Sequence, residues 1–332
     1  MILILSNLRD VSTELVEDVL LANKIDFYRV NEEDEIWLEK FEINKTSFKI
    51  WLRCIDTFNQ QKLIKLETVS AFWYRRGIFG IRLKHDLIKN KYIRRYLNNV
   101  KITLLDFILS LLVDVKHVNK FEDIYVNKLY VLHIAGKCGL DIPHTFLTEK
   151  LNEINKIDKD KFITKEFVYP YFTLNKIDIY PLTKLISDYN FNIINDISLS
   201  LIQKKIDKNF DIRIFFINRK FYSAAIFSND SKKTKIDFRD YEHEDAPRII
   251  RYSLPKEILI KLKKLVSYLN INCGSMDMIK GRDGKFYFLE INPIGQWQFI
   301  SENCYFKLEN EIAKALVNKK IEHNEKKTKY LL

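Results

Sequence analysis

The stretch GSMDMIKGRDGKFYFLEINPIGQW, from Gly274 to Trp297, determines how the rest of the chain is interpreted. An apolar run with a single acid predicts a short strand at 275–279, and alternating polar and apolar residues predict a second strand at 285–291. Arg282-Asp283-Gly284 lies between them and has the residue types that form a turn. The stretch therefore predicts an antiparallel hairpin.

Three oxygen-bearing side chains of this hairpin are expected on one face. Glu290 and Asn292 lie two residues apart, so they point to the same side of their strand, and an antiparallel partner can place Asp277 beside them. Two carboxylates and an amide oxygen suit Mg²⁺, which takes its other ligands from water and substrate phosphates. The alternative is an ordinary hairpin whose acids face solvent. The run Glu-x-Asn-Pro after a hydrophobic strand favours the metal site.

The composition is that of a globular protein. The chain has 332 residues, 47% hydrophobic and 30% charged, which is enough for two or three domains. The N-terminal MILILSNLRD has an apolar run far too short for a signal peptide, so we expect a buried first strand. No stretch approaches the roughly 20 apolar residues of a membrane span, and no membrane partner is expected. The longest apolar stretch, 102–115, is interrupted by Asp106 and Ser110 and predicts a core helix.

Cysteine usage and charge restrict the functional classes. The four cysteines show no Cys-x-x-Cys spacing, which argues against a zinc site and predicts a reducing, cytoplasmic location. The net charge of +11 comes from Lys and Arg mixed with acids along the chain, so we expect no nucleic-acid partner. The alternatives are a solvated basic surface or attraction to polyanionic partners such as ATP and acidic peptides.

Residues 1–118 are predicted to form an N-terminal α/β domain. Strands are expected at Ile2–Leu5 and Asp26–Val30, with a helix between them that is capped by Ser12 or Thr13. No Gly-x-Gly-x-x-Gly follows the first strand, so a Rossmann dinucleotide site is not supported.

A further strand, expected at 71–74, ends in Trp73-Tyr74-Arg75-Arg76-Gly77. Two adjacent arginines at the end of a strand can contact an anionic substrate. A solvated pair beside a buried tryptophan is an equally good interpretation, and the residues alone do not decide between them.

The remaining chain is predicted to form a central domain at 119–198 and a C-terminal domain at 199–332. In the central domain Lys128 precedes a helix, and Lys165 ends a strand that begins at Phe162. The C-terminal domain is expected to contain a strand edge at 200–203 that leads to Ile206, a hairpin of 210–217 with 221–227, a helix that starts at Pro255, the hairpin already described and a helix at 308–317.

Taken in order, the polar residues of these segments suit ATP. Lys128 and Lys165, on separate elements, can bind phosphates as point charges. The strand edge at 203–206 offers backbone groups to the adenine. Arg213 can stabilise the charge that develops when a carboxylate attacks the γ-phosphate, and Asp211 belongs to the same set. Each residue alone is weak evidence, because an isolated Lys or Arg is more often on the surface; the ordered set is much stronger.

This ordered set resembles the ATP-grasp superfamily. The matching parts are Asn127-Lys128-Leu129, Thr164-Lys165, Asp211-Ile212-Arg213 and FLEINP at 288–293. A narrower resemblance, to the graspetide peptide maturases of the microviridin and "grasp-with-spasm" kind, rests on SAFWYRRG at 70–77, AIFS at 225–228, DFR at 237–239, Tyr241, and NCGSMDMI with FLEINPIGQW near the end. The ending Asn-Pro-Ile-Gly-Gln-Trp is its most specific part, since most ATP-grasp ligases continue differently after the asparagine.

The resemblance implies an α/β (α+β) ATP-grasp fold with an N-terminal pre-ATP-grasp domain, a central domain and a C-terminal ATP-grasp domain. It implies an ADP-forming ligase that uses ATP and Mg²⁺ to phosphorylate an Asp or Glu side chain of a ribosomally made precursor peptide. A Ser or Thr hydroxyl, or a Lys amine, of the same peptide then closes an ester or amide ring. The partner would be an acidic precursor with a leader segment. Homodimers are common among such enzymes, so a homodimer is a further expectation.

The resemblance also implies residue roles by position. Lys128 and Lys165 would contact phosphates, while Asp277, Glu290 and Asn292 would bind Mg²⁺. Arg213 and Arg239 would hold the reacting carboxylate or acyl phosphate, Asp237 would be a general base or would orient Arg239, and residues 165–176 would contact the leader.

Two features depart from the superfamily. Residues 166–176 contain no glycine where many members have a glycine-rich phosphate lid. The hinge carries Lys204 and Lys205 where an acid is common, so recognition of adenine by the backbone of Gln203 to Ile206 is expected. The alternative functions are a carboxylate–amine ligase acting on a small molecule or a protein terminus, and a non-catalytic nucleotide-binding protein.

Overall fold

The computed structural model describes residues 1–82, 90–168, 172–174, 177–179, 182–191, 197–228, 236–239 and 246–317. Its internal contacts divide the chain into two compact units, Met1–Ile124 with Lys307–Leu332, and Tyr125–Phe306. The last described helix, α7 (Leu308–Leu316), packs against α1 and β8 of the first unit. The three-domain division with boundaries at 118 and 198 stays a prediction.

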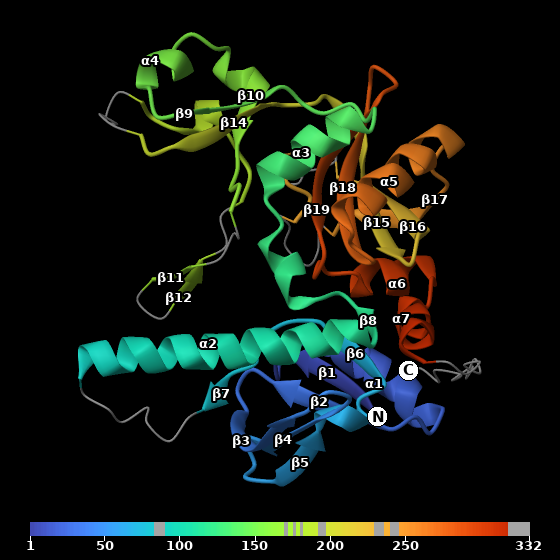
Figure 1. Ribbon diagram of the computed structural model, residues 1–332. Helices are drawn as coiled ribbons and strands as arrows, with labels where there is room; N and C mark the ends of the chain where they lie inside the picture. The colour runs from blue at the N-terminus through green and yellow to red at the C-terminus, as the bar shows by residue number, and fades with distance from the viewer. Residues whose placement is uncertain are drawn as a thin grey trace. The chain divides into compact units, whose positions relative to one another are not determined.

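The first unit contains a parallel sheet in the order β2-β1-β6-β8. Its elements are β1 (Ile2–Ser6), α1 (Val11–Ala22), β2 (Phe27–Asn31), β6 (Ala71–Tyr74) and β8 (Lys116–Val118). Strand β1 is fully buried, as its uninterrupted apolar sequence predicts, and the strands expected at 2–5, 26–30 and 71–74 are confirmed. Parallel neighbours require the crossover helix α1, which Figure 1 shows beside the sheet.

The N-terminal cap of α1 is Asp10, and the prediction of Ser12 or Thr13 is wrong. Asp10 has the extended backbone of a capping residue, and its carboxylate accepts a hydrogen bond from the Thr13 amide at 3.2 Å. Ser12 and Thr13 lie inside the first turn. The hydroxyl of Thr13 instead forms a buried hydrogen bond of 2.8 Å with that of Ser6.

The first unit also contains an antiparallel hairpin sheet and a long helix. The sheet has the order β5-β4-β3-β7, formed by β3 (Glu35–Ile43), β4 (Phe48–Ile55), β5 (Gln61–Lys65) and β7 (Ile81–Arg82), and the helix is α2 (Lys91–Asp114). The short 3₁₀ helices of the chain are Leu66–Thr68, Phe121–Tyr125, Lys159–Lys161 and Ile186–Asp188.

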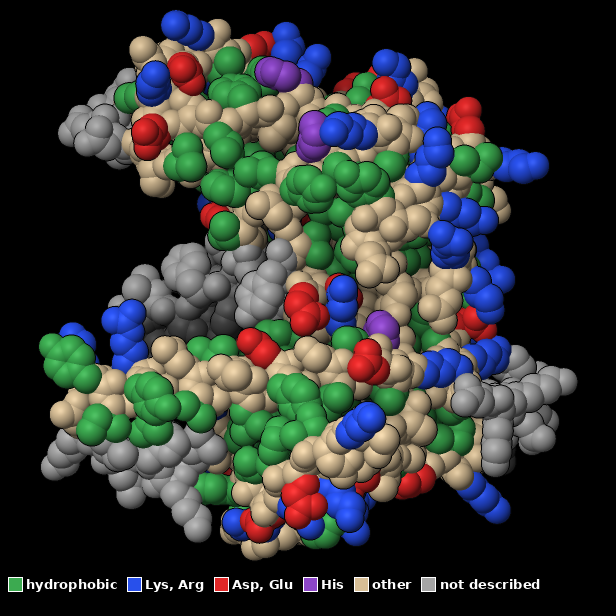
Figure 2. Space-filling model, in the orientation of Figure 1, with side chains coloured by type: hydrophobic (Ala, Val, Ile, Leu, Met, Phe, Trp, Pro, Cys, Tyr) green, Lys and Arg blue, Asp and Glu red, His purple; other side chains and the backbone are tan. Residues whose placement is uncertain are grey.

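The helix predicted at 102–115 is confirmed as part of α2, which begins at Lys91. Two other expectations about this stretch are wrong. It is not a core helix, because only Ile108, Leu109 and Leu112 are buried. With its full length, α2 is also long and apolar enough to cross a membrane by length and composition alone, with 17% of its most apolar window buried. Core helices of soluble proteins meet the same criterion. Figure 2 shows hydrophobic side chains on the surface of this part of the molecule.

The second unit contains a small sheet in the order β13-β10-β14-β9. Its strands are β9 (Thr145–Thr148), β10 (Phe162–Thr164), β13 (Lys184–Leu185) and β14 (Ser200–Lys204), with the short helix α4 (Leu151–Ile154) and the strand pair β11 (Phe172–Leu174) and β12 (Ile177–Ile179). Ile154, Ile186 and Ile202 form its core. This sheet lies at the top in Figure 1.

The other sheet of the second unit is antiparallel, in the order β17-β16-β15-β18-β19. It consists of β15 (Lys208–Ile217), β16 (Lys220–Phe227), β17 (Arg248–Tyr252), β18 (Cys273–Gly281) and β19 (Phe286–Asn292). Besides α4, the unit contains the helices α3 (Lys128–Lys137), α5 (Lys256–Leu269) and α6 (Gln298–Cys304). The two predicted hairpins are confirmed as β15–β16 and β18–β19.

One face of this sheet is apolar and forms the main core of the unit. Ile214, Met276, Met278 and Phe288 are 0% exposed and belong to one hydrophobic cluster with residues of α3 and α5. Burying such side chains stabilises the fold by about 1.5–3 kcal/mol each. Because strand residues alternate between faces, the residues between them point to the opposite side.

Candidate functional site

A row of charged side chains crosses the opposite face of the five-stranded sheet. The strand register places Arg213 of β15 beside Asp277 of β18, and Asp277 beside Glu290 of β19. Nη1 of Arg213 donates to both carboxylate oxygens of Asp277, at 2.9 and 2.8 Å. The predicted convergence of Asp277 and Glu290 on one face is therefore found, with an arginine bound to one end of the row.

Two lysines approach the other end of this row. Nζ of Lys128, at the start of α3, lies 3.2 Å from Oε2 of Glu290, and Nζ of Lys165, after β10, lies 4.0 Å from the same oxygen. Burial alone would raise the pKa of Glu290, but the charges of Lys165 and Lys128 hold it below its ordinary value. Burial likewise lowers the pKa of Lys165, against the effect of Glu290. This part of the surface thus holds a carboxylate between two ammonium groups.

The NPIGQW motif forms the loop after β19, and this loop is held against the charged row. Nε and Nη2 of Arg213 donate to the carbonyl of Gln296 at 3.2 and 2.6 Å, so one guanidinium joins Asp277 to this loop. Gly295 lies so close to β18 that a Cβ there would be 2.8 Å from that of Ser275. Trp297 is 2% exposed and packs beside Phe215. Only glycine fits at residue 295, which explains that part of the motif.

Asp237 and Arg239 form a separate ion pair in the second unit. Asp237 is 6% exposed and accepts hydrogen bonds from Nε and Nη2 of Arg239, at 2.8 and 2.5 Å, and from the Thr183 amide at 3.3 Å. Burial opposes the charge of Asp237, but Arg239 holds its pKa below the ordinary value. The hydrogen bonds to Asp237 raise the pKa of Arg239, which Asp277 and Glu290 raise further. A carboxylate bound in this way orients the arginine and is a poor base.

Asp211 lies on the same face as Arg213 but has its own partners. Its Oδ2 is 2.6 Å from Nζ of Lys208 and accepts a hydrogen bond of 2.5 Å from Ser228. Burial raises the pKa of Asp211, and Lys208 opposes this effect. Sequence reasoning did not identify Lys208 or Ser228. A regular strand would place residues 208 and 211 on opposite faces, and an irregularity in the β15–β18 register between 208 and 210 brings them together.

The prediction that Gln203 lies on a free strand edge is wrong. Strand β14 pairs with β10 on one side and with β9 on the other, and the side chain of Gln203 donates to the Thr145 hydroxyl at 2.9 Å. The amides of Lys204 and Lys205 donate to the carbonyls of His144 and Lys161. Ile206 follows the strand, and among the described residues its backbone amide makes no hydrogen bond.

The donor chemistry of the row fits a hard divalent cation. Asp277 and Glu290 supply carboxylate oxygens from neighbouring strands, and Asn292 lies two residues beyond Glu290, where its Oδ1 accepts the Ile294 amide at 3.2 Å. The described residues contain no group of three or more His, Cys, Asp and Glu that could hold a metal by themselves. Such a pair of carboxylates suits Mg²⁺ that takes most of its oxygens from phosphates and water.

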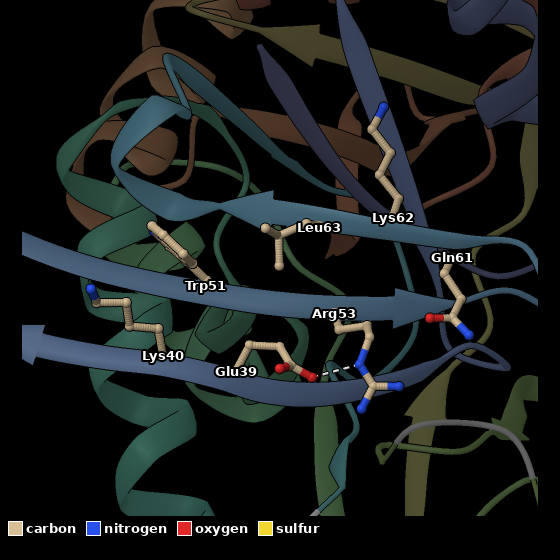
Figure 3. A pocket seen from close by; sticks show the side chains of 7 residues that line it. All are labelled: Glu39, Lys40, Trp51, Arg53, Gln61, Lys62 and Leu63. Carbon is tan, nitrogen blue, oxygen red and sulfur yellow. Dashed lines mark hydrogen bonds and ion pairs between the residues drawn. The ribbon is translucent and has the colours of Figure 1, made fainter.

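A pocket of about 530 Å³ lies in the first unit, on the hairpin sheet. Figure 3 shows side chains of β3, β4 and β5 around it, with an ion pair of 2.5 Å between Arg53 and Glu39. Nζ of Lys40 and of Lys65 lie 4.9 Å from the Trp51 ring. These charged groups are partnered within the sheet, and the pocket shares no residue with the charged row.

Comparison with known proteins identifies the fold. No family model matches the sequence, and a search of curated proteins finds no match. Among solved structures, macrocyclase MdnC of Microcystis aeruginosa MRC, bound with precursor peptide MdnA, is similar at 23% identity and a TM-score of 0.72 over 96% of this chain and 99% of that chain. A Chryseobacterium gregarium RiPP-associated ATP-grasp ligase, in complex with ADP and a leader and core peptide, gives 22% and 0.75 over 95% and 96%. The chain therefore has the ATP-grasp fold, as its motifs predict.

Proposed function

We propose that the protein is an ATP-dependent peptide macrocyclase, an ADP-forming ligase that joins Asp or Glu side chains of a peptide to Ser or Thr hydroxyls or Lys amines of the same peptide. The observation that carries the proposal is the row Arg213–Asp277–Glu290, with Lys128 and Lys165 at its end, on an ATP-grasp fold. Structurally similar proteins that were solved with a bound precursor peptide, or with a leader and core peptide, support a peptide substrate.

The charged row is suited to a nucleotide triphosphate with Mg²⁺. Asp277, Glu290 and the amide of Asn292 would hold the metal, which neutralises phosphate charge and aligns the γ-phosphate when bound. Lys128 and Lys165 would bind phosphate oxygens. The amide of Ile206, which makes no hydrogen bond to the described residues, is the part of the predicted hinge that would bind adenine. A solved relative named ATP-grasp ligase PsnB, in complex with minimal precursor, Mg and ADP, supports this assignment.

The reaction requires two transfers. An oxygen of the peptide carboxylate attacks the γ-phosphorus, and ADP leaves with the electrons of the broken P–O bond. The hydroxyl or amine then attacks the acyl carbon, phosphate leaves with the electrons of the broken C–O bond, and the proton of the nucleophile passes to the departing phosphate or to water. Arg239, whose side chain is 52% exposed, would bind the reacting carboxylate, and Asp237 would orient it. Arg213, held by Asp277 and Gln296, would fix the metal ligand and the loop beside it.

The partner is proposed to be an acidic peptide with a leader segment. The net charge of +11 favours acidic chains. The expected leader contacts at 165–176 lie partly outside the described residues, as does Tyr241. The four free cysteines support a reducing compartment, in agreement with the expected cytoplasmic location. A homodimer stays a prediction.

The second candidate function is a carboxylate–amine ligase that acts on a small molecule. The supporting observation is a match to the D-cycloserine synthetase DcsG at a TM-score of 0.52 and 11% identity over 95% of this chain. The same charged row would serve this reaction, since both reactions activate a carboxylate with ATP. The substrate alone separates the two candidates.

Mass spectrometry of an acidic, Thr- and Lys-containing peptide encoded beside this protein tests the proposal. With enzyme, ATP and Mg²⁺, the peptide should lose one water per bond formed, and omission of ATP or chelation of Mg²⁺ should abolish the loss. Products that open in mild alkali would be esters rather than amides. An unchanged peptide, with ADP released only when small amines or amino acids are added, would replace the macrocyclase by the small-molecule ligase.

A further inference from the structure

The first half of α2 carries a row of large apolar side chains that is open to solvent. The buried residues of this helix all lie in its second half. The first half exposes Tyr92 (82%), Ile93 (47%), Tyr96 (67%) and Val100 (41%). These residues are spaced by three or four positions or are direct neighbours of such positions, so they lie on one side of the helix. We call them the α2 stripe. An exposed apolar surface of this kind marks a site of contact with an apolar partner.

The α2 stripe continues into a larger apolar surface of the first unit. Phe107 lies seven residues after Val100, on the same side of the helix, and its ring centroid is 5.7 Å from that of Phe41 on β3. Phe41 is 42% exposed, and Ile43, two residues further along the same face of β3, is 60% exposed. The apolar surface therefore extends from the first half of α2 onto the hairpin sheet.

The other side of this half of the helix is basic. Residues 91–105 contain no acid, and Asp106 and Asp114 follow only in the second half. In Figure 2, hydrophobic and basic side chains lie together at the left end of this helix. The cations of the first half are Lys91, Arg94 and Arg95, which are exposed, and Lys101, which is partly exposed. A helix with an apolar stripe on one side and Lys and Arg on the other is typical of helices that lie in the headgroup region of a membrane.

The fold does not allow α2 to span a bilayer, although its length and composition would. Its second half packs into the first unit, and the cations of the first half, together with Asp106, would enter the hydrocarbon. The expectation of no membrane partner rests on the absence of an apolar run long enough for a span. A helix that lies on the membrane surface needs no such run.

A second copy of the chain fits the α2 stripe less well than an anionic surface does. Two stripes that faced each other would bring together two sets of four cations, and like charges on neighbouring helices repel. At an anionic surface the same cations attract, because each Lys or Arg near acidic headgroups strengthens binding. The net charge of +11 acts in the same direction.

We propose that the first half of α2 binds the surface of a membrane that contains anionic phospholipids. The α2 stripe lies among the headgroups, and the flanking Arg and Lys side chains pair with lipid phosphates. Tyr92 and Tyr96 suit this position, because a ring with a polar tip favours the boundary between hydrocarbon and water. The inference uses the first unit alone and does not depend on the proposed reaction.

Co-sedimentation of the full chain with phospholipid vesicles tests the proposal, without ATP or peptide. Vesicles of phosphatidylcholine alone are compared with vesicles that also contain phosphatidylglycerol, at low and at high salt. We expect the protein to bind the anionic vesicles only, and to bind them more weakly at high salt because the charges are screened. No binding to anionic vesicles, or equal binding to both kinds, would overturn the proposal.

Charge variants locate the contact on the protein. Arg94→Gln combined with Arg95→Gln should weaken binding to anionic vesicles by at least about tenfold, since each cation near such a surface contributes about fivefold. The matched control is Lys263→Gln combined with Lys264→Gln, an adjacent exposed pair on α5 of the second unit. It should change binding by less than about twofold, because charges far from the surface are screened. Equal losses from the two pairs would show that binding follows net charge, and would overturn the proposal.

The apolar part of the contact is tested at unchanged charge by Ile93→Gln combined with Val100→Gln. Glutamine is a good helix former, and the loss of two apolar side chains should weaken vesicle binding by about tenfold. Ile260→Gln is the control, because Ile260 on α5 is 53% exposed, and it should have no effect. All of these variants should melt within a few degrees of wild type. Undiminished vesicle binding after substitution of Ile93 and Val100 would exclude the α2 stripe.

Light scattering of the eluting protein in size-exclusion chromatography separates the membrane from a second copy as the partner. Wild type and the variant with Ile93→Gln and Val100→Gln should have the same mass in solution and differ only in vesicle binding. A dimer of the wild type that this variant dissociates would assign the α2 stripe to a second copy of the chain and overturn the membrane proposal.

Discussion

The two faces of the five-stranded sheet in the second unit are built from the same strands and hold opposite kinds of residues. Met276 and Met278 are fully buried under α3 and α5, while Asp277, between them in the sequence, lies in the charged row on the other side. The alternation of a strand makes this possible, because each residue points away from its neighbours. Residues that stabilise the fold and residues of the proposed active site are thus direct neighbours in the sequence.

The comparison shows why a rigid apolar face is needed beneath the charged one. Asp277 and Glu290 are direct neighbours on adjacent strands, and like charges at that distance repel each other. Arg213, Lys128 and Lys165 offset the repulsion through ion pairs. The packing of the opposite face holds the backbone in register, so we expect substitutions on the charged face to affect chemistry and those on the apolar face to affect stability.

The largest effect is expected from Glu290→Ala. It removes a carboxylate from the proposed metal site and leaves Lys128 and Lys165 without their shared partner. Turnover should fall by about 10³-fold or more, since a metal ion contributes several kcal/mol to such transition states. Calorimetry should show that Mg²⁺-dependent ADP binding is lost as well.

Glu302→Ala is a suitable control for this substitution. Glu302 lies on α6 and accepts a hydrogen bond from Gln298 on the same helix, outside the charged row. It should retain activity, and both variants should melt within a few degrees of wild type. Undiminished cyclisation by Glu290→Ala would remove Glu290 from the metal site.

The apolar face is tested by Phe288→Ala. Phe288 is 0% exposed and belongs to the main core, so its truncation should lower the free energy of unfolding by about 3–5 kcal/mol. At a temperature where the variant remains folded, kcat should stay close to that of wild type. Denaturant unfolding and turnover measured on the same sample decide this.

Tyr287→Ala provides the matched control from the neighbouring residue. Tyr287 points to the other side, and its hydroxyl donates to Asp283 in the turn at 2.7 Å. It should cost far less stability. Equal losses from residues 287 and 288 would mean that the two faces are not separated as described.

The sequence predicted the charged row better than the sheet that adjoins it. Asp277 and Glu290 belong to one hairpin, so a short stretch of sequence brings them near each other, and a register irregularity between Asp277 and Met278 makes Glu290 rather than Leu289 the neighbour of Asp277. The position of β14 depends on β9 and β10, which lie about 55 and 40 residues earlier in the chain, respectively, and no local pattern indicates that both flank it. Lys208 was not predicted as a partner of Asp211 for a related reason, because a register irregularity changes the face on which a residue lies.

Arg213→Ala should have a smaller effect than loss of a metal ligand. The substitution removes the hydrogen bonds to Asp277 and to the carbonyl of Gln296, which leaves the metal ligand less well oriented. Turnover should fall by about 10²-fold, a magnitude typical for the loss of one oriented charged group. Nucleotide binding, measured by calorimetry, should be retained. A wild-type rate would remove Arg213 from the mechanism.

The smallest effect expected is a pH-dependent change of stability in Asp237→Asn. Asp237 is buried, and Arg239 lowers its pKa in the folded protein below the ordinary value of 3.8. The unfolded chain therefore binds the proton more readily, and the ion pair stabilises the fold above about pH 4, by roughly 1 kcal/mol because Arg239 is half-exposed. This contribution is lost as the pH falls through the lowered pKa. The unfolding free energies of wild type and variant should thus differ at pH 7 and converge towards pH 3, and a gap that is constant with pH would show that Asp237 is not held ionised by Arg239.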